Sequence, residues 1–297
     1  MPARSVSRWP RLALMAKRGI AAEIELLDPT RDYQRICFLS TNFDFSWDVE
    51  QSLSLAFFKT YAVPTISALL EKTGEFRDHA QKRYDDTKLI LAEMLDHGID
   101  SERGRDANRR LNRMHGRYAI SNDDYLYVWS VILLEPLRWN RRWGWRRYTQ
   151  KEIDAQLVYA HELALRMNIH DAPATIDEAD RWSRAYETAT FRFAETNRRV
   201  ADYTLNLYLS WYPRGVRPLV RLATLSLLEN ELLAAFGYER PPRWAVASVD
   251  AVLRLRAFVL RFLPPRRTPR LVTKETMRSY PDGYAMTDLG VADIDRL

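Results

Sequence analysis

Apolar residues recur along most of the chain at intervals of three to four positions, the spacing typical of amphipathic helices. Strand-like alternation of apolar and polar residues does not appear. The sequence therefore predicts an all-α protein of crossed helices. The expected helices cover about 48–61, 64–72, 77–96, 101–118, 124–134, 150–169, 176–211, 218–236 and 244–262.

Local signals set the expected helix ends. Thr149 with Glu152, and Thr175 with Glu178, have the spacing of a capping box, in which each residue satisfies a free backbone N–H of the first turn. The second box is expected to open one long helix that reaches about Trp211.

A second set of end signals surrounds the most apolar segment. Asn122 and Asp123 are typical N-cap residues, and Pro136 is expected to stop the following helix at about Leu134. The tail from Pro264 is rich in Pro and Arg and weakly periodic, so we expect it to wrap over the surface.

Length and composition indicate one domain, with a core over about 45–263 and an extended tail over 264–297. Of the 297 residues, 46% are hydrophobic, which is ample for one large core. The 45 basic and 39 acidic residues are interspersed, so the net charge of +6 does not by itself indicate a nucleic-acid partner. The lone Cys37 favours a reducing compartment and is expected to be a small buried apolar residue.

No targeting or membrane-spanning segment is expected. The apolar run over 12–15 is far too short for a signal peptide. The best candidate span, 53–70, is interrupted by Lys59 and Pro64. We therefore expect a cytoplasmic protein, for which peripheral contact with a membrane stays open.

Polar residues interrupt the apolar stripe of the helix over 77–96. Arg83 and Thr87 are four residues apart, hence neighbours on one face, and that face borders the stripe. A guanidinium there needs an anion or several acceptors, because an unpaired buried charge is costly. The alternative is a structural salt bridge, and Thr87 alone could bond a backbone carbonyl. The carboxylates considered for that bridge are Asp85, Asp86 and Glu135.

An imidazole occupies the stripe of the next helix. His115 lies four residues from Leu111 and three from Tyr118, so it is expected to point inward. Taken alone, such a residue is more often a hydrogen-bonded core histidine than a ligand. Facing Arg83 and Thr87 across an antiparallel helix pair, however, it suits a flat anionic cofactor. Haem needs an axial imidazole, with cations or hydroxyls near its other face or its propionates.

Several sequence blocks resemble a family of haem oxygenases that groups the latex-clearing rubber oxygenases with the ER-bound oxygenase of the mycophenolic acid pathway. The block Lys82–Thr87 is similar to the KRxxDT element of this family, and the resemblance extends over roughly 60–285. The other similar blocks are 111–116, 120–127, 135–139, 144–146, 166–169 and 281–284.

This resemblance implies a globin-like helical fold with one b-type haem. It implies that His115 is the proximal iron ligand and that Arg83 and Thr87 lie in the distal pocket. Asp86 takes the place of a Lys in the rubber oxygenases, which makes rubber a poor substrate hypothesis. Asp86, Glu71 and Glu75 are the candidates for a distal base, with Asp86 included among the catalytic residues.

The implied reaction is insertion of O₂ into, or cleavage of, a C=C bond in a hydrophobic isoprenoid-like or other unsaturated substrate. The partners expected are that substrate and O₂, without nucleic acid. The alternative is a non-catalytic helical protein that binds haem or an apolar ligand. Other metal chemistries fit badly, since the histidines lack the Glu-x-x-His spacing of di-iron proteins and the zincin pattern.

The segment 138–147 holds five Arg and three Trp. It has the composition of a lipid anchor or a single-stranded nucleic-acid site. We favour a third interpretation, a structural loop in which Arg stacks on Trp and caps helix ends.

Overall fold

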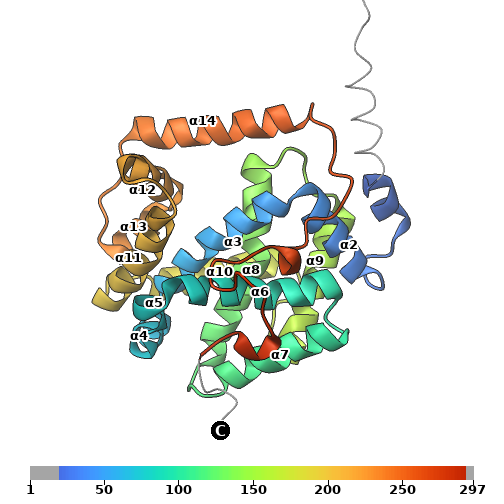
Figure 1. The fold of residues 1–297 in the computed structure, drawn as a ribbon, viewed down its shortest axis with the longest axis horizontal. Helices are drawn as coiled ribbons and strands as arrows, with labels where there is room; N and C mark the ends of the chain where they lie inside the picture. The colour runs from blue at the N-terminus through green and yellow to red at the C-terminus, as the bar shows by residue number, and fades with distance from the viewer. Residues whose placement is uncertain (1–19, 292–297) are drawn as a thin grey trace, which may run out of the picture.

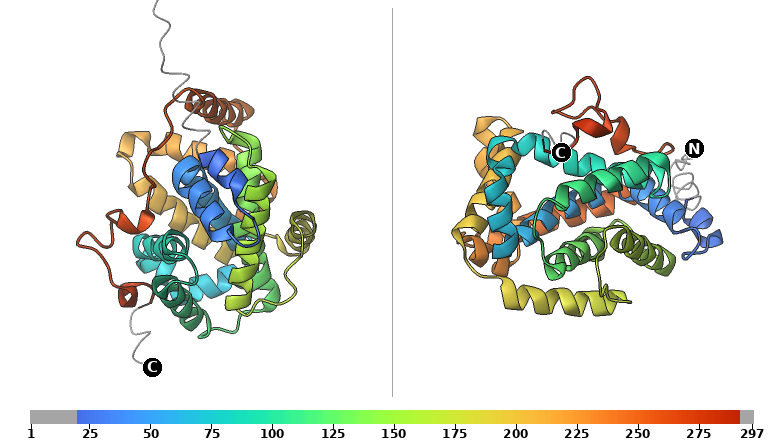
Figure 2. Two further views of the ribbon diagram at one scale, coloured as in Figure 1. Left: turned by 90° about the vertical axis from the view of Figure 1, so that its right-hand side faces the viewer. Right: turned by 90° about the horizontal axis from the view of Figure 1, so that it is seen from below.

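Helices make up nearly all of the computed structural model, which describes residues 20–291 (Figure 1, Figure 2). The all-α prediction is confirmed. A helical turn covers 20–26, and a π-helical turn covers Ser40–Asp44. The 3-10 turns are Arg214–Val216, Val272–Lys274 and Met286–Asp288. The α-helices are α2 (Tyr33–Leu39), α3 (Ser46–Tyr61), α4 (Pro64–Thr73), α5 (Glu75–Asp78), α6 (Ala80–His97), α7 (Glu102–His115), α8 (Asn122–Trp143), α9 (Gln150–Arg166), α10 (Ile176–Thr190), α11 (Glu195–Ser210), α12 (Arg217–Leu227), α13 (Asn230–Phe236) and α14 (Arg243–Leu260).

Helix α8 is the centre of the fold and packs against α3, α9 and α10 (Figure 1). Its apolar side chains are buried on several sides, and its indole N–H groups find acceptors on the neighbouring helices. Trp129 donates to the carbonyl of Ala160 on α9 at 2.7 Å, and Trp139 donates to Asp48 on α3 at 3.0 Å. These bonds fix how α8 lies against both partners.

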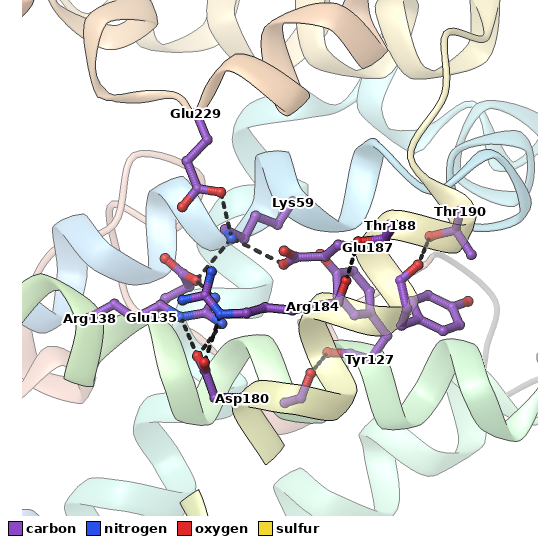
Figure 3. Close-up of polar contacts among 12 residues, drawn as sticks. Lys59, Tyr127, Glu135, Arg138, Asp180, Arg184, Glu187, Thr188, Thr190 and Glu229 are labelled. Atoms are coloured by element: carbon purple, nitrogen blue, oxygen red, sulfur yellow. Dashed lines mark hydrogen bonds and ion pairs between the residues drawn. The ribbon is translucent and has the colours of Figure 1, made fainter. Parts of the chain in front are cut away.

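A buried charge cluster ties α3 to α8, α10 and the turn before α13 (Figure 3). The ammonium of Lys59 lies 3.4 Å from Glu135, 3.1 Å from Glu187 and 3.1 Å from Glu229. Burial alone would lower the pKa of Lys59, but these carboxylates more than compensate and raise it. Arg138 donates to the same oxygen of Glu135, Oε1, so this carboxylate is shared by two cations.

The prediction that Pro136 stops its helix is wrong. Helix α8 starts at Asn122, with Ser121 as the N-cap, and continues through Pro136 to Trp143. Proline in a helix interior costs about 3 kcal/mol. Burial of Leu137, Trp139 and Trp143 beyond the proline offsets that cost, because each large apolar side chain contributes roughly 1.5–3 kcal/mol.

The expected helix over 176–211 is two helices, α10 and α11, separated by an extended stretch over 191–194. The buried amide of Asn197 donates to the carbonyls of Arg192, at 2.9 Å, and Ala62, at 3.0 Å. It thereby satisfies a backbone group that the break leaves free. Two other predicted helices also divide, at His79 and at 228–229, whereas the capping boxes at Thr149 and Thr175 are confirmed.

The segment after α14 lies over α6 and α7, as Figure 1 shows in red. We call residues 271–291 the C-terminal strap. Its Met277 and Leu289 are buried against these helices. Arg110 of α7 donates to the carbonyl of Leu289 at 2.7 Å, so the strap is fastened by polar contacts as well. The expected surface-wrapping tail is confirmed for the part of it that the structure describes.

Within residues 20–291, none of the helices taken singly has the length and hydrophobicity to cross a bilayer. The combination of α3 and α4 passes that test only as a pair bent by 99°.

Candidate functional site

The candidate site lies between α6 and α7, which form an antiparallel helical hairpin. Their connection is the short turn over 98–101. Arg83 lies about as many residues before this turn as His115 lies after it. Both residues are therefore at the open end of the hairpin, away from the turn. The N-cap Ser101 accepts a hydrogen bond from Gly104 and fixes the start of α7.

His115 is the last residue of α7, and its ring is largely buried beside Tyr125, with ring centroids 5.5 Å apart. Its Nδ1 is buried and has no hydrogen-bond partner among the described residues. Burial, and then the charge of Arg83, lower the pKa of His115 to about 4. The imidazole is therefore neutral at physiological pH, which is the form that binds a metal.

His161 provides a contrast within the same chain. Its Nε2 lies 2.8 Å from the carbonyl of Pro173, and its ring stacks on Trp129 at 5.6 Å. It is thus a hydrogen-bonded core histidine, which is the alternative that the sequence left open for His115. His115 lacks such a partner, and a buried polar atom of this kind needs a ligand or costs stability.

Arg83 projects from the first part of α6 and makes no ion pair with any carboxylate in residues 20–291. Its guanidinium donates to the hydroxyl of Thr87 and lies over the ring of Phe76, 5.5 Å from the centroid. The positive charge of Arg83 helps to lower the pKa of His115. It also opposes the rise in the pKa of Tyr61 that burial causes. The cation therefore lies over the Phe76 ring and within electrostatic reach of His115, without a described carboxylate to neutralise it.

Thr87 connects the guanidinium to the helix backbone. Its hydroxyl donates to the carbonyl of Arg83 at 3.0 Å, as the alternative interpretation of this residue expected. The same oxygen accepts the hydrogen bond from the Arg83 side chain. Thr87 thus holds the guanidinium at the side of α6 that meets α7.

The salt bridges considered for Arg83 are not formed, because each candidate carboxylate has other partners. Asp85 accepts from Gln81 at 3.0 Å and from the backbone of Ser279 at 2.9 Å. Glu135 belongs to the Lys59 cluster described above.

Asp86 lies on a different side of α6 from Arg83 and Thr87. Its carboxylate is 2.8 Å from the ammonium of Lys82, and it accepts from the hydroxyl of Tyr280 and from the backbone of Gly290 at 2.9 Å. These contacts turn the carboxylate toward the C-terminal strap. The structure therefore does not bring Asp86 together with Arg83 and His115, against the expectation of a distal-pocket acid.

Glu71 is the candidate base with a free oxygen. Its Oε1 lies 3.4 Å from the hydroxyl of Tyr203 and 3.7 Å from Arg199, while its Oε2 is buried without a hydrogen-bond partner. The helix that carries it, α4, is joined to α6 through the short α5. Glu75, at the start of α5, is half-buried.

Tyr61, Phe76 and Tyr125 surround the site. The sequence places Phe76 on the inward apolar stripe that Arg83 and Thr87 border, but it gives none of the three a role in the site. Tyr125 belongs to one of the blocks similar to the oxygenase family, directly after the charged pair at 123–124. Tyr61 ends α3 and is fully buried, with its ring 5.4 Å from that of Phe76. An aromatic residue at a helix end carries no local signal of its role, so only the packing identifies it.

The segment 138–147 is engaged in internal contacts. Arg142 stacks on Trp143 at 4.3 Å, and Arg146 pairs with Asp44 at 2.6 Å and Glu152 at 2.7 Å. Arg147 donates to the carbonyl of Asn140 at the end of α8. These contacts agree with a structural role for the segment. The expectation of a loop is wrong for 138–143, which belong to α8, and holds only for 144–147.

The residues present are compatible with haem. Among residues 20–291, no group of three or more His, Cys, Asp or Glu side chains is placed to hold a bare metal ion. A haem needs only an axial ligand from the protein, because its ring supplies the other nitrogens. The unpartnered nitrogen of His115 and the unneutralised cation of Arg83 meet the two requirements of an iron ligand and a partner for negative charge.

These features define a helical protein whose hairpin presents a neutral imidazole and a free cation at one end. The chain belongs to the family described as ER-bound oxygenase mpaB/B'/Rubber oxygenase, catalytic domain, whose sequence model matches residues 51–261. It is thus a member of an oxygenase family, as the sequence blocks indicated. Arg83, Thr87 and His115 all lie within the matched range.

Three curated relatives come from Penicillium. The ER-bound oxygenase mpaB' of Penicillium brevicompactum is 28% identical, over 93% of this chain and 70% of that protein. The mpaB protein of the same species is 28% identical, over 76% of this chain and 56% of its own length. The mpaB protein of Penicillium roqueforti is 27% identical, over 62% of this chain and 67% of its own length.

Proposed function

We propose that this chain is a haem b-dependent oxygenase that inserts O₂ into, or cleaves, a C=C bond of a hydrophobic isoprenoid-like or other unsaturated substrate. Membership of the oxygenase family supports the class of reaction. The observation that carries the haem assignment is the neutral imidazole of His115, whose buried Nδ1 has no partner, within electrostatic reach of the Arg83 guanidinium, which no described carboxylate neutralises. A bound haem would supply the activation of O₂.

The residues of the hairpin have distinct roles in this proposal. His115 holds the iron through its free nitrogen. Arg83 offers N–H donors to negative charge, either on a haem propionate or on an oxygenated substrate, and Thr87 fixes the direction of the guanidinium. Tyr61 and Phe76 make this side of the half-buried cation apolar, which strengthens its electrostatic effect.

Glu71 is the candidate base that we place first. Its free, buried Oε2 is able to accept a proton from an allylic carbon of the substrate. Asp86 is the weakest candidate, because its oxygens already accept hydrogen bonds from the strap. In the cleavage reaction both atoms of one O₂ end in two carbonyl groups, so no external reductant is required.

The location that we propose is a membrane surface. The fungal relatives are named ER-bound, which argues against the purely cytoplasmic location expected from the sequence. We extend only membrane contact to this chain, and not the organelle.

The first experiment measures haem binding. Protein produced in haem-supplied cells, or reconstituted with haem, is expected to show a Soret band at one haem per chain. His115→Ala is expected to lose the haem and keep its helical circular dichroism, whereas His161→Ala keeps the haem. Equal haem content in the wild type and His115→Ala would remove the ligand assignment.

The second experiment separates an enzyme from a carrier. O₂ consumption is followed with polyprenyl and unsaturated lipid substrates, and product oxygen is traced from labelled O₂. Arg83→Ala is expected to retain haem and lose most turnover, while Arg109→Ala, an exposed arginine on α7, behaves as the wild type. Haem binding without any substrate-dependent O₂ consumption would favour the non-catalytic alternative.

A further inference from the structure

Helix α14 presents an exposed face of large apolar side chains. Trp244, Leu255, Phe258 and Phe262 are 64%, 61%, 55% and 58% exposed. Leu255 and Phe258 stand 11 and 14 positions after Trp244, which are close to whole helical turns, so these three side chains lie on one side of α14. Phe262 lies just beyond the end of the helix, with its ring 5.1 Å from that of Phe258. Small exposed alanines at 247 and 251 fill the space between them. A contiguous apolar surface of this kind marks an interaction site.

The opposite side of α14 holds the helix on the body of the protein. Ala245, Leu253 and Ala257 are buried there, and the helix packs against α12 and α8. Figure 1 shows α14 stretched across the outer edge of the described fold, and the left view of Figure 2 shows it end-on at the same edge. The exposed stripe therefore runs along an outer edge that is able to meet a flat surface over its whole length.

Positive charge is concentrated around this helix. Residues 239–270 contain eight Arg against only Glu239 and Asp250, a net charge of +6. Of these arginines, Arg256 pairs with Asp48 and Arg270 with Glu50 and Glu275, so the others provide the charge that is available at the surface. Asp250 does not weaken the stripe, because it turns to the body side, where it accepts from Trp143 at 3.0 Å and pairs with Arg254.

The arginines border the apolar stripe along one edge. Arg243, Arg254 and Arg261 are 11 and 7 positions apart, again close to whole turns. Arg254 shares its charge with Asp250 and Arg261 donates to the carbonyl of Trp145, so Arg243 is the one of the three without an internal hydrogen bond or ion pair among the described residues. Arg266 and Arg267 follow directly after the helix and are exposed. An apolar face with a cationic border and without acidic side chains matches the interface of an anionic phospholipid bilayer.

We propose that α14 is a membrane-docking helix that lies in the plane of an anionic bilayer surface, with its stripe in the acyl boundary and its arginines among the headgroups. The charge pattern favours lipid over a protein partner, since negative charge is spread over the whole plane of such a bilayer. The inference deepens the membrane location proposed above but rests on α14 alone. A failed vesicle experiment would therefore leave the haem site untouched.

The test is flotation of the full-length protein with vesicles. The wild type is expected to float with phosphatidylcholine vesicles that contain about a quarter phosphatidylserine, and to bind pure phosphatidylcholine much more weakly. Raised salt is expected to reduce the anionic component of binding. Leu255→Ser with Phe258→Ser is expected to lower the partition coefficient roughly tenfold or more, because two large apolar side chains no longer enter the bilayer.

Matched controls distinguish docking from a general effect of surface polarity. Leu165→Ser on α9 removes an apolar side chain that is 72% exposed away from α14, and is expected to leave vesicle binding unchanged. Arg243→Gln with Arg267→Gln is expected to weaken binding to anionic vesicles by about fivefold per arginine and to leave binding to neutral vesicles unaltered.

Three results would overturn the proposal. The first is a wild type that does not float with either vesicle. The second is equal binding by the wild type and the Leu255/Phe258 variant while both remain folded. The third is a wild type that forms a dimer in analytical ultracentrifugation, with a monomeric Leu255/Phe258 variant and no vesicle binding by either protein. That result would assign the stripe to contact with a second copy of the chain. Should the double variant unfold, Phe262→Ser, which lies beyond the end of α14, takes its place.

Discussion

The depressed pKa of His115 makes a prediction that needs neither haem nor substrate. In the folded protein without haem this pKa is about 4, whereas the ordinary value is 6.5. Between these values the unfolded chain binds a proton that the folded chain does not, so stability rises with pH through this window and falls as the pH is lowered. His115 therefore contributes an acid sensitivity that a neutral side chain would lack.

The size of the effect follows from the two pKa values. A shift of one pKa unit corresponds to about 1.4 kcal/mol, so the full shift is worth roughly 3 kcal/mol below pH 4. Going from pH ~7.5 to pH ~4.5, the His115 contribution to the free energy of unfolding falls by about 2.5 kcal/mol. His115→Gln is expected to remove this fall, whatever it does to stability at neutral pH.

The assay is urea unfolding of haem-free protein at both pH values, for the wild type, His115→Gln and the control His170→Gln. His170 is exposed, so its replacement is expected to leave the pH dependence as in the wild type. Arg83→Met is expected to reduce the fall in part, since the charge of Arg83 is the second cause of the shift after burial. An identical pH dependence for the wild type and His115→Gln would refute the buried, uncharged state of this imidazole.

Three further predictions concern the frame around the site. Lys59→Met leaves two carboxylates buried without their cation and is expected to cost about 3 kcal/mol or more in urea unfolding; a loss below about 1 kcal/mol would show that the cluster is solvated. Asp86→Asn weakens the contacts of the strap and is expected to cost about 1–3 kcal/mol and to speed proteolysis of the strap, with haem content unchanged. A loss of haem in the Asp86→Asn variant would indicate that Asp86 contributes to the haem site. Gly290→Ala is expected to lower the melting temperature, since residue 290 has φ +94° and a methyl group there would meet Met114; an unchanged melting temperature would contradict this close packing.

The family and the helical class were predictable from the sequence, because both are indicated by patterns among residues close together in the chain. Capping boxes such as Thr149 with Glu152 act within one turn, and apolar periodicity acts within a few turns. The placement of Arg83 and His115 at one end of the helical hairpin was predictable for the same reason. A short turn between two helices forces them to be antiparallel. Residues at equal distances before and after that turn therefore lie at the same level of the hairpin.

Contacts between distant segments were not accessible in this way. The continuation of α8 through Pro136 depends on apolar side chains supplied by its neighbours. The break over 191–194 depends on Asn197, which also bonds the carbonyl of Ala62, 135 positions earlier in the chain. In both cases the local signal was overridden by packing energy that no window of adjacent residues contains.

The sequence by itself determined the helical class, the capping boxes and the residues that share the end of one hairpin, but not every helix boundary. Only the tertiary structure decided which of the candidate base carboxylates has an oxygen without a hydrogen-bond partner. Asp86 is held by the strap some 200 positions later in the chain, while Glu71 keeps a buried oxygen without a partner. Hydrogen bonds and burial are properties of neighbours in space, and spacing along the chain fixes those neighbours only over a few residues.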